Sequence, residues 1–371
     1  MCVIAGYSGN RRAAPILIEM IRKIERFDGG APTGIVTIHE GKLYVAKALG
    51  DVDMLLKMTN AMDLPGTTGL IHSRPGDDFM NTCHPYLDDS GKYAVVENGT
   101  SAGTGNEAFF AEMRTIMDEL LDRGISSPNS RDRLWDLGYN KLAYTKDGKP
   151  FYPICNPFAL GIGDAVRDTP PEQMKTALAS ATKAMHERLP TDNISVAVHA
   201  DLPDTITVCT VSRPMSVLEA EGETYLASCA IAFPEDVKGK VTHLPTCSLS
   251  QITPEGLTLL SDTLEGVRVE PVTEEILRAY TDAIVEQMGK KPLSIYEFKR
   301  PEVWHEPMVD CDRFVKPNSM LKPDMPALYQ ALYRLYKEGR LTYFTDVLYG
   351  RDSLFGWPVR DWYFTKFSVK Q

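Results

Sequence analysis

The second residue of the chain, Cys2, leads directly into a short apolar run, Val3-Ile4-Ala5-Gly6-Tyr7, which is typical of a buried strand. If Met1 is removed, one backbone unit carries both a thiol and a free α-amine. The ordinary pKa of an α-amine is about 7.7–8.0, so this amine can accept the thiol proton near neutral pH. Amidases whose nucleophile is the N-terminal residue use this arrangement. The alternative is that Cys2 is a small buried residue at the start of an edge strand.

Two later segments offer groups that could hold and activate an amide substrate. His72-Ser73-Arg74 ends a predicted strand, and the planar guanidinium of Arg74 matches a carboxylate in a bidentate fashion. The alternative for this arginine is an ordinary surface ion pair. A further predicted strand runs into Asn98-Gly99, which is the commonest hairpin signal. The chemical interpretation is that the Asn98 amide and the Gly99 backbone N–H point together at a developing oxyanion.

Cys83-His84 lies between these two segments and suggests a Cys–His dyad. Neighbours on a strand point to opposite faces, however. We therefore interpret His84 as a structural residue.

The elements that must position these residues can be read from the hydrophobic pattern. Helical periodicity predicts six helices: Arg11–Phe27, Val52–Met62, Asn106–Arg123, Pro171–Leu189, Thr273–Met288 and Ala327–Tyr336. Strands are expected at Thr33–His39, Lys42–Ala48, Thr68–Arg74, Tyr93–Glu97, Ile194–Ala200, Thr205–Ser212, Thr224–Ser228, Val241–Leu244, Leu257–Leu260, Leu341–Thr345 and Trp362–Ser368. The order lacks a regular β-α-β-α alternation, so an α+β class with antiparallel sheets fits best.

The composition excludes several classes of function. A formal net charge of −10 argues against a nucleic-acid binder, and no apolar run is long enough to span a bilayer. The seven cysteines are scattered without C-x-x-C spacing, which argues against a zinc site and a disulfide framework. No metal or cofactor is expected. No signal peptide precedes the first strand, and the cytoplasm is the expected compartment.

At 371 residues the chain is expected to form two domains, at 1–262 and 263–371. In the second, a helix followed by Lys337-Glu-Gly-Arg-Leu and two aromatic strands suggests a winged-helix-like module. This region carries as many basic as acidic residues. A protein-contact or lid role fits it better than a grip on DNA.

Together, these residues carry a family resemblance. The chain resembles the class II glutamine amidotransferase domain, an N-terminal nucleophile hydrolase, as found in glucosamine-6-phosphate synthase. The matching pieces are Met1-Cys2 with its strand, the Ala13–Glu25 helix, His72-Ser73-Arg74, His84-Pro85, Val95–Gly99 and the stretch beginning at Glu223. The resemblance covers roughly residues 2–262.

The resemblance implies a four-layer αββα sandwich and a thioester mechanism. It assigns Cys2 as nucleophile with its α-amine as base, Arg74 as carboxylate clamp, and Asn98 with Gly99 as oxyanion hole. The family also uses an aspartate to hold the substrate's α-ammonium, and Asp132 is the candidate for that role. Glutamine or a related amide is the expected substrate, the ammonia acceptor is expected on a partner protein, and a homo-oligomer is compatible with the sequence.

The chain departs from the family at two places. Val3 stands where the family usually has glycine, and the loop after Arg74 is several residues shorter than the family's substrate-covering loop. Two other functions therefore stay open. One is hydrolysis of a different γ-glutamyl or small amide, and the other is a catalytically inactive regulatory or binding module that keeps the fold.

Overall fold

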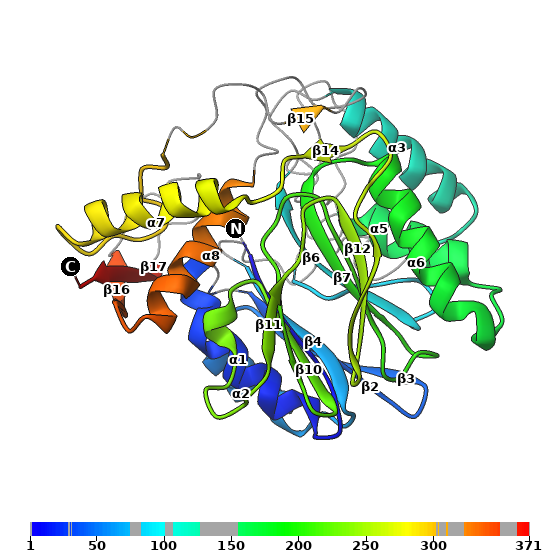
Figure 1. Ribbon diagram of the computed structural model, residues 1–371. Helices are drawn as coiled ribbons and strands as arrows, with labels where there is room; N and C mark the ends of the chain where they lie inside the picture. Colours follow the sequence, from blue (N-terminus) through cyan, green and yellow to red (C-terminus); the bar gives the residue numbers. More distant parts are fainter. Residues whose placement is uncertain are drawn as a thin grey trace.

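Two stacked antiparallel sheets form the centre of the molecule, with helices on both outer sides (Figure 1). This computed structural model describes residues 2–28, 30, 32–74, 83–100, 107–126, 155–301, 303, 309–310, 323–348 and 362–370. Met1 and the predicted Asp132 lie outside these residues. Every described strand pair is antiparallel, so the predicted mixed class with antiparallel sheets is confirmed.

The first sheet has seven described strands with β1 and β4 near its middle. Its order is β11 (Lys240–His243), β9 (Ser216–Ala220), β10 (Glu223–Ala227), β1 (Val3–Ser8), β4 (Thr68–Ser73), β2 (Thr33–His39) and β3 (Lys42–Ala48). All six residues of β1 are buried. This strand is covered on both faces, which explains why its sequence is a nearly continuous apolar run.

The second sheet has six described strands and carries the Asn98 segment on β6. Its order is β13 (Gly256–Ser261), β12 (Ser248–Thr253), β8 (Ile206–Thr210), β7 (Asp192–His199), β6 (Tyr93–Thr100) and β5 (Tyr86–Leu87). The sequence pattern missed β9 and β12. Both are short, and each is separated from its neighbour by only a tight turn.

A shared apolar core joins the two sheets. Ile4, Val36 and Leu70 of the first sheet form one buried cluster with Val96 and Val196 of the second. Alternate residues of each strand therefore face the opposite sheet. This stacking brings the start of β1 close to the end of β6.

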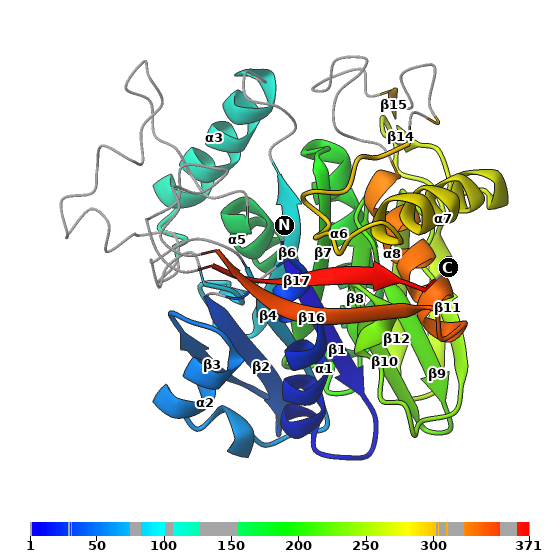
Figure 2. The same cartoon turned by 90° about the vertical axis from the view of Figure 1, so that its left-hand side faces the viewer.

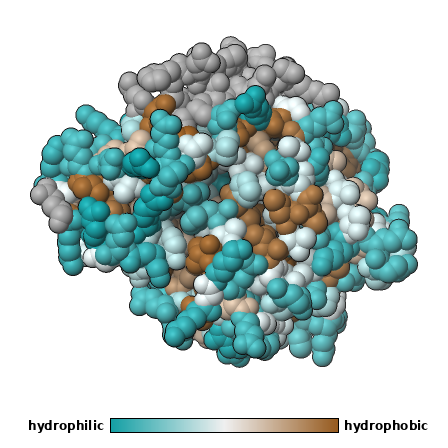
Figure 3. Space-filling model, in the orientation of Figure 1, coloured by the Kyte–Doolittle hydropathy of each residue, from teal (hydrophilic) through white to brown (hydrophobic). Residues whose placement is uncertain are grey.

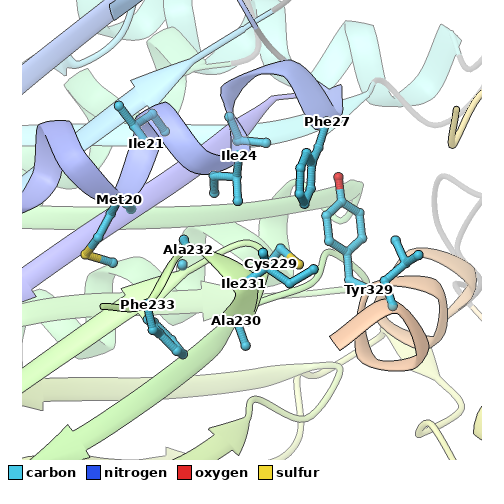
Figure 4. Close-up of a cluster of buried hydrophobic side chains, with 14 of the residues drawn as sticks. Met20, Ile21, Ile24, Phe27, Cys229, Ala230, Ile231, Ala232, Phe233 and Tyr329 are labelled. Atoms are coloured by element: carbon cyan, nitrogen blue, oxygen red, sulfur yellow. The ribbon is translucent and has the colours of Figure 1, made fainter. Parts of the chain in front are cut away.

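The outer face of the first sheet is covered by α1 (Ala13–Asp28), whose apolar stripe includes Leu17, Ile21 and Ile24. The same helix packs against the short helix η4 (Ala230–Ala232), which in turn packs against α8 (Asp324–Lys337). Figure 4 shows Met20, Ile21, Ile24 and Phe27 facing Cys229–Phe233 and Tyr329. One buried cluster thus connects the first sheet to the C-terminal elements.

The outer face of the second sheet is covered by α3 (Glu107–Asp122), α5 (Cys155–Val166) and α6 (Pro171–Arg188). Of these, α5 was not predicted. Its sequence is apolar nearly all round and contains two glycines, so it has no helical stripe to detect.

The predicted helix Val52–Met62 is wrong after Met58. Asp51 caps α2 (Val52–Met58) by accepting a hydrogen bond from the Met54 N–H at 3.0 Å. The backbone turns extended at Thr59, whose hydroxyl donates to the Leu55 carbonyl at 2.7 Å and accepts from the Ala61 N–H at 3.1 Å. A separate 3-10 turn, η1 (Ala61–Asp63), follows.

The C-terminal region contains α7 (Glu274–Met288), α8 and the hairpin of β16 (Leu341–Leu348) with β17 (Trp362–Val369). A short strand before α7, β14 (Arg268–Val269), pairs with β15 (Val309–Asp310), which lies between α7 and α8. In Figure 2 the hairpin runs across the end of α1. The Phe27 and Phe367 rings meet edge to face there, 4.9 Å apart.

The surface in the orientation of Figure 1 is hydrophilic over most of its rim, with hydrophobic side chains gathered nearer the middle (Figure 3). Among the described residues, none of the helices is long and apolar enough to cross a membrane.

Candidate active site

Asn98 holds the backbone of Cys2 at both of its polar groups. The Cys2 nitrogen donates to Asn98 Oδ1 at 3.1 Å, and Asn98 Nδ2 donates to the Cys2 carbonyl at 2.7 Å. Asn98 is 2% exposed, whereas Cys2 is half-buried. An asparagine amide has two N–H hydrogens, so one remains for a further acceptor beside Cys2.

Residues Asn98 and Gly99 lie inside β6 and pair with Ile194 and Asn193 of β7. The hairpin interpretation of this Asn-Gly pair is therefore wrong. The physical reason is that β6 continues past the apolar run to Thr100, since β7 supplies a partner for the whole strand.

A side chain at Gly99 would collide with β7. A Cβ added there would lie 2.5 Å from Asn193 Cβ and 2.8 Å from the Asp192 carbonyl oxygen. The glycine is needed for this close approach of two backbones. It also leaves residue 99 exposed at the end of the strand.

The strand register places Arg74 beside Cys2. Val3 pairs with Ser73 in the β1–β4 ladder. The residues just beyond this pair, Cys2 and Arg74, therefore lie next to each other at the same end of the two strands. The Arg74 backbone N–H donates to the Pro32 carbonyl at 3.1 Å. The structure thus places Cys2, Arg74, Asn98 and Gly99 close together, and their catalytic roles stay predictions.

Two buried histidines surround the residue that precedes Asn98. His72 Nε2 donates to the Glu97 carbonyl at 2.9 Å, and the Glu97 N–H donates to His84 Nδ1 at 3.1 Å. The two imidazoles stack with their centroids 4.0 Å apart. Burial lowers the pKa of His72 to about 3 and that of His84 well below its usual range, so both rings are neutral.

The side chain of Glu97 lies on the helix-facing side of the second sheet, with Cys155 at the start of α5 nearby. Burial raises the pKa of Glu97 to about 8, although a hydrogen bond with the Cys155 thiol opposes the shift. Burial and the neighbouring Glu97 also raise the pKa of Cys155 well above its usual range. Its sulfur lies 3.5 Å from His84 Nε2.

Sequence reasoning gave no role to Glu97 or Cys155. A glutamate inside the run Val95-Val96-Glu97 was a signal for the first, because a charged residue on a strand buried on both faces needs a special environment. Nothing in the sequence marked Cys155, whose place depends on how α5 docks. In the described part of the chain, no three His, Cys, Asp or Glu side chains are grouped so as to hold a metal ion.

No protein-family model matches the chain. The glutamine–fructose-6-phosphate aminotransferase of Pyrococcus horikoshii is 36% identical over 130 residues, which is 33% of this chain and 20% of the relative. The enzyme of that name from Synechocystis is 26% identical over 319 residues, which is 83% of this chain and 43% of the relative.

The resemblance to the glutamine amidotransferases is confirmed.

Solved structures agree on the fold. The glutamine phosphoribosylpyrophosphate amidotransferase of B. subtilis, complexed with ADP and GMP, superposes with a TM-score of 0.51 at 14% identity, covering 80% of this chain and 62% of that one. The chain spans less than half the length of the aminotransferases it matches. The shared part is thus one portion of those longer enzymes.

Proposed function

We propose that this chain is a glutamine amidotransferase of class II that hydrolyses the glutamine side-chain amide at Cys2. The observation that carries the proposal is the two-bond contact between Asn98 and the Cys2 backbone, with Arg74 beside it. This contact joins the start of β1 in the first sheet to the end of β6 in the second. It supports the proposal because it holds the Cys2 nitrogen, which becomes an amine base once Met1 is removed, beside the Asn98 amide.

In the proposed mechanism, removal of Met1 exposes the Cys2 α-amine, which takes the thiol proton. The thiolate attacks the side-chain amide carbon of glutamine, and the resulting oxyanion accepts hydrogen bonds from the remaining Asn98 N–H and from the Gly99 N–H. The ammonium of Cys2 returns the proton as the C–N bond breaks and ammonia leaves. Water then attacks the thioester, which releases glutamate and the thiol.

Two groups are proposed to hold the substrate's amino-acid end. Arg74 would bind the α-carboxylate through its planar guanidinium. Asp132 would bind the α-ammonium and lies outside the described residues. We propose that the ammonia passes to an acceptor on a partner protein, and no further cofactor enters the reaction.

We also propose the finer architecture that the resemblance implies. The two sheets and their outer helices would be the four-layer αββα sandwich of an N-terminal nucleophile hydrolase, over residues 1–262. Residues 263–371 would be a second, winged-helix-like module. The sequence of α8, the Gly339 turn and the β16–β17 hairpin supports this proposal.

Intact mass and a glutamine analogue test the function. We expect the purified protein to lack Met1 and to gain one adduct with 6-diazo-5-oxo-norleucine. Cys2→Ala should abolish both the adduct and ammonia release from glutamine, and Cys2→Ser should sharply reduce the release. Cys229→Ala, a matched control that removes a thiol buried under α1, should keep both.

The other candidate functions predict different outcomes. An enzyme for another γ-glutamyl or small amide would form the adduct slowly and release an amine from that amide but not from glutamine. An inactive module would form no adduct although Met1 is gone. Wild-type ammonia release by Cys2→Ala would exclude the mechanism altogether.

A further inference from the structure

Glu97 occupies the point where β6 loses its neighbour on one side. β5 pairs with β6 only at Tyr86–Val95 and Leu87–Ala94. Beyond that point the Glu97 N–H and carbonyl on this edge bond instead to the two imidazoles, His84 Nδ1 and His72 Nε2. A pair of side chains therefore takes the place of a strand for one residue.

We propose that His72 and His84 are positioning residues, which fix the Glu97 peptide so that Asn98 and Gly99 are held against Cys2. The proposal rests on the function proposed above. Neither ring has to touch the substrate, because the effect passes through the backbone of one residue. It also revises the structural role expected for His84.

The hydrogen bonds define which nitrogen of each ring carries the proton. A carbonyl oxygen only accepts hydrogen bonds, so His72 Nε2 is protonated. His84 Nδ1 is unprotonated, because it accepts from the Glu97 N–H. His84 Nε2 then carries its hydrogen and lies 3.5 Å from the Cys155 sulfur. Both rings are neutral in this arrangement, which lets them stack at 4.0 Å without charge repulsion.

His72 also links the two halves of the candidate site. It lies on β4, two residues before Arg74, while Glu97 lies on β6, one residue before Asn98. The bond from His72 to the Glu97 carbonyl thus crosses from one sheet to the other. It sets the separation between the proposed carboxylate clamp and the proposed oxyanion donors.

Loss of the hydrogen bonds from His72 and His84 to the Glu97 backbone should affect the chemical step more than substrate binding. A misplacement of about 1 Å can cost on the order of 100-fold in rate. We expect His84→Leu and His72→Leu to lower kcat for glutamine hydrolysis by about 10- to 100-fold. KM for glutamine should change by less than about threefold, because Arg74 stays in place directly after β4.

Conservative variants separate the hydrogen bonds from simple packing. An asparagine amide places its oxygen near the position of Nδ1, whereas a glutamine amide reaches that of Nε2. His84→Asn should therefore recover most of kcat and His84→Gln should not, while His72→Gln should recover it through a donor at the Nε2 position. This comparison among polar variants also holds if a leucine variant fails to fold.

His199 provides a matched control on the same sheet. It is 3% exposed, and its Nδ1 accepts the Asp201 N–H at 3.1 Å, but it pairs with Tyr93 at the opposite end of β6. His199→Leu should lower the melting temperature comparably and leave kcat within about twofold of wild type. Equal losses of kcat in all the histidine variants would overturn the proposal.

Hydrogen–deuterium exchange of residues 95–99 tests the hydrogen bonds to the Glu97 backbone without using glutamine. Exchange at the Glu97 amide should be slow in wild type and His84→Asn and fast in His84→Gln. Unchanged exchange, or a folded His84→Leu with kcat within threefold of wild type, would overturn the proposal. Wild-type protein that fails to hydrolyse glutamine but shows this exchange pattern would refute the proposed function and leave the backbone contact established.

Discussion

A neutral carboxyl group next to the candidate site should make the stability of the fold fall as pH rises. Glu97 is 4% exposed and lies among apolar residues of the second sheet and its helices. Burial raises its pKa from an ordinary 4.5 to about 8. The folded protein therefore keeps the Glu97 proton at neutral pH, while the unfolded chain has lost it.

The sign and size follow from proton linkage. Between about pH 5 and 8 the folded state binds one more proton at Glu97 than the unfolded state, so rising pH favours unfolding. Each pKa unit corresponds to about 1.4 kcal/mol. The cost of this carboxyl should thus grow by at most about 1.4 kcal/mol per pH unit, to a limit of about 5 kcal/mol above pH 8.

Glu97→Gln removes the titration and keeps the shape. Urea unfolding of wild type and variant at pH 5, 6, 7 and 8 should show the variant gaining stability relative to wild type at each step. Glu119→Gln, at a glutamate that is 62% exposed on α3, is the control and should show no such trend. A difference between Glu97→Gln and wild type that stays constant within about 0.5 kcal/mol over this range would mean that Glu97 is already ionised in the folded state.

Three further substitutions probe the site itself. Arg74→Ala should raise KM for glutamine by about 10- to 100-fold in steady-state assays, and lysine should rescue poorly because it lacks the planar fork; an unchanged KM would make the arginine structural. Asn98→Asp should lower kcat by about 10²–10³ and also the melting temperature, because aspartate cannot donate to the Cys2 carbonyl; unaltered melting and kcat would contradict both roles. Gly99→Ala should cost about 1–3 kcal/mol in urea unfolding, since its Cβ would meet Asn193 and the Asp192 carbonyl; full stability would show that β7 can move away.

Local pattern determined most of the elements and the order of the candidate residues. The run after Cys2 was predicted as a strand, and the helical stripe that follows it matches α1 (Ala13–Asp28). Thr273 before two glutamates marked the start of α7, where its side chain accepts the Ile276 N–H. These features depend on neighbours a few residues away, which the sequence displays directly.

Other parts needed partners that are distant in the chain. The strand β6 extends through Asn98 and Gly99 because β7 lies beside it, although Asn-Gly by itself favours a turn. The helix α5 is apolar on nearly all sides, which suits its place between the second sheet and two helices. Tertiary packing overrode local preference in both places.

The sequence by itself determined which residue types could do chemistry here: a cysteine at position 2, an arginine ending a strand, and an asparagine before glycine. Only the tertiary structure decided that Asn98 hydrogen-bonds to the backbone of Cys2, which lies 96 residues earlier in the chain. The same holds for the hydrogen bonds of two imidazoles to the backbone of Glu97. These bonds form where the ends of strands from two stacked sheets meet. Strand order and register set that meeting point, and both depend on contacts spread over the whole fold.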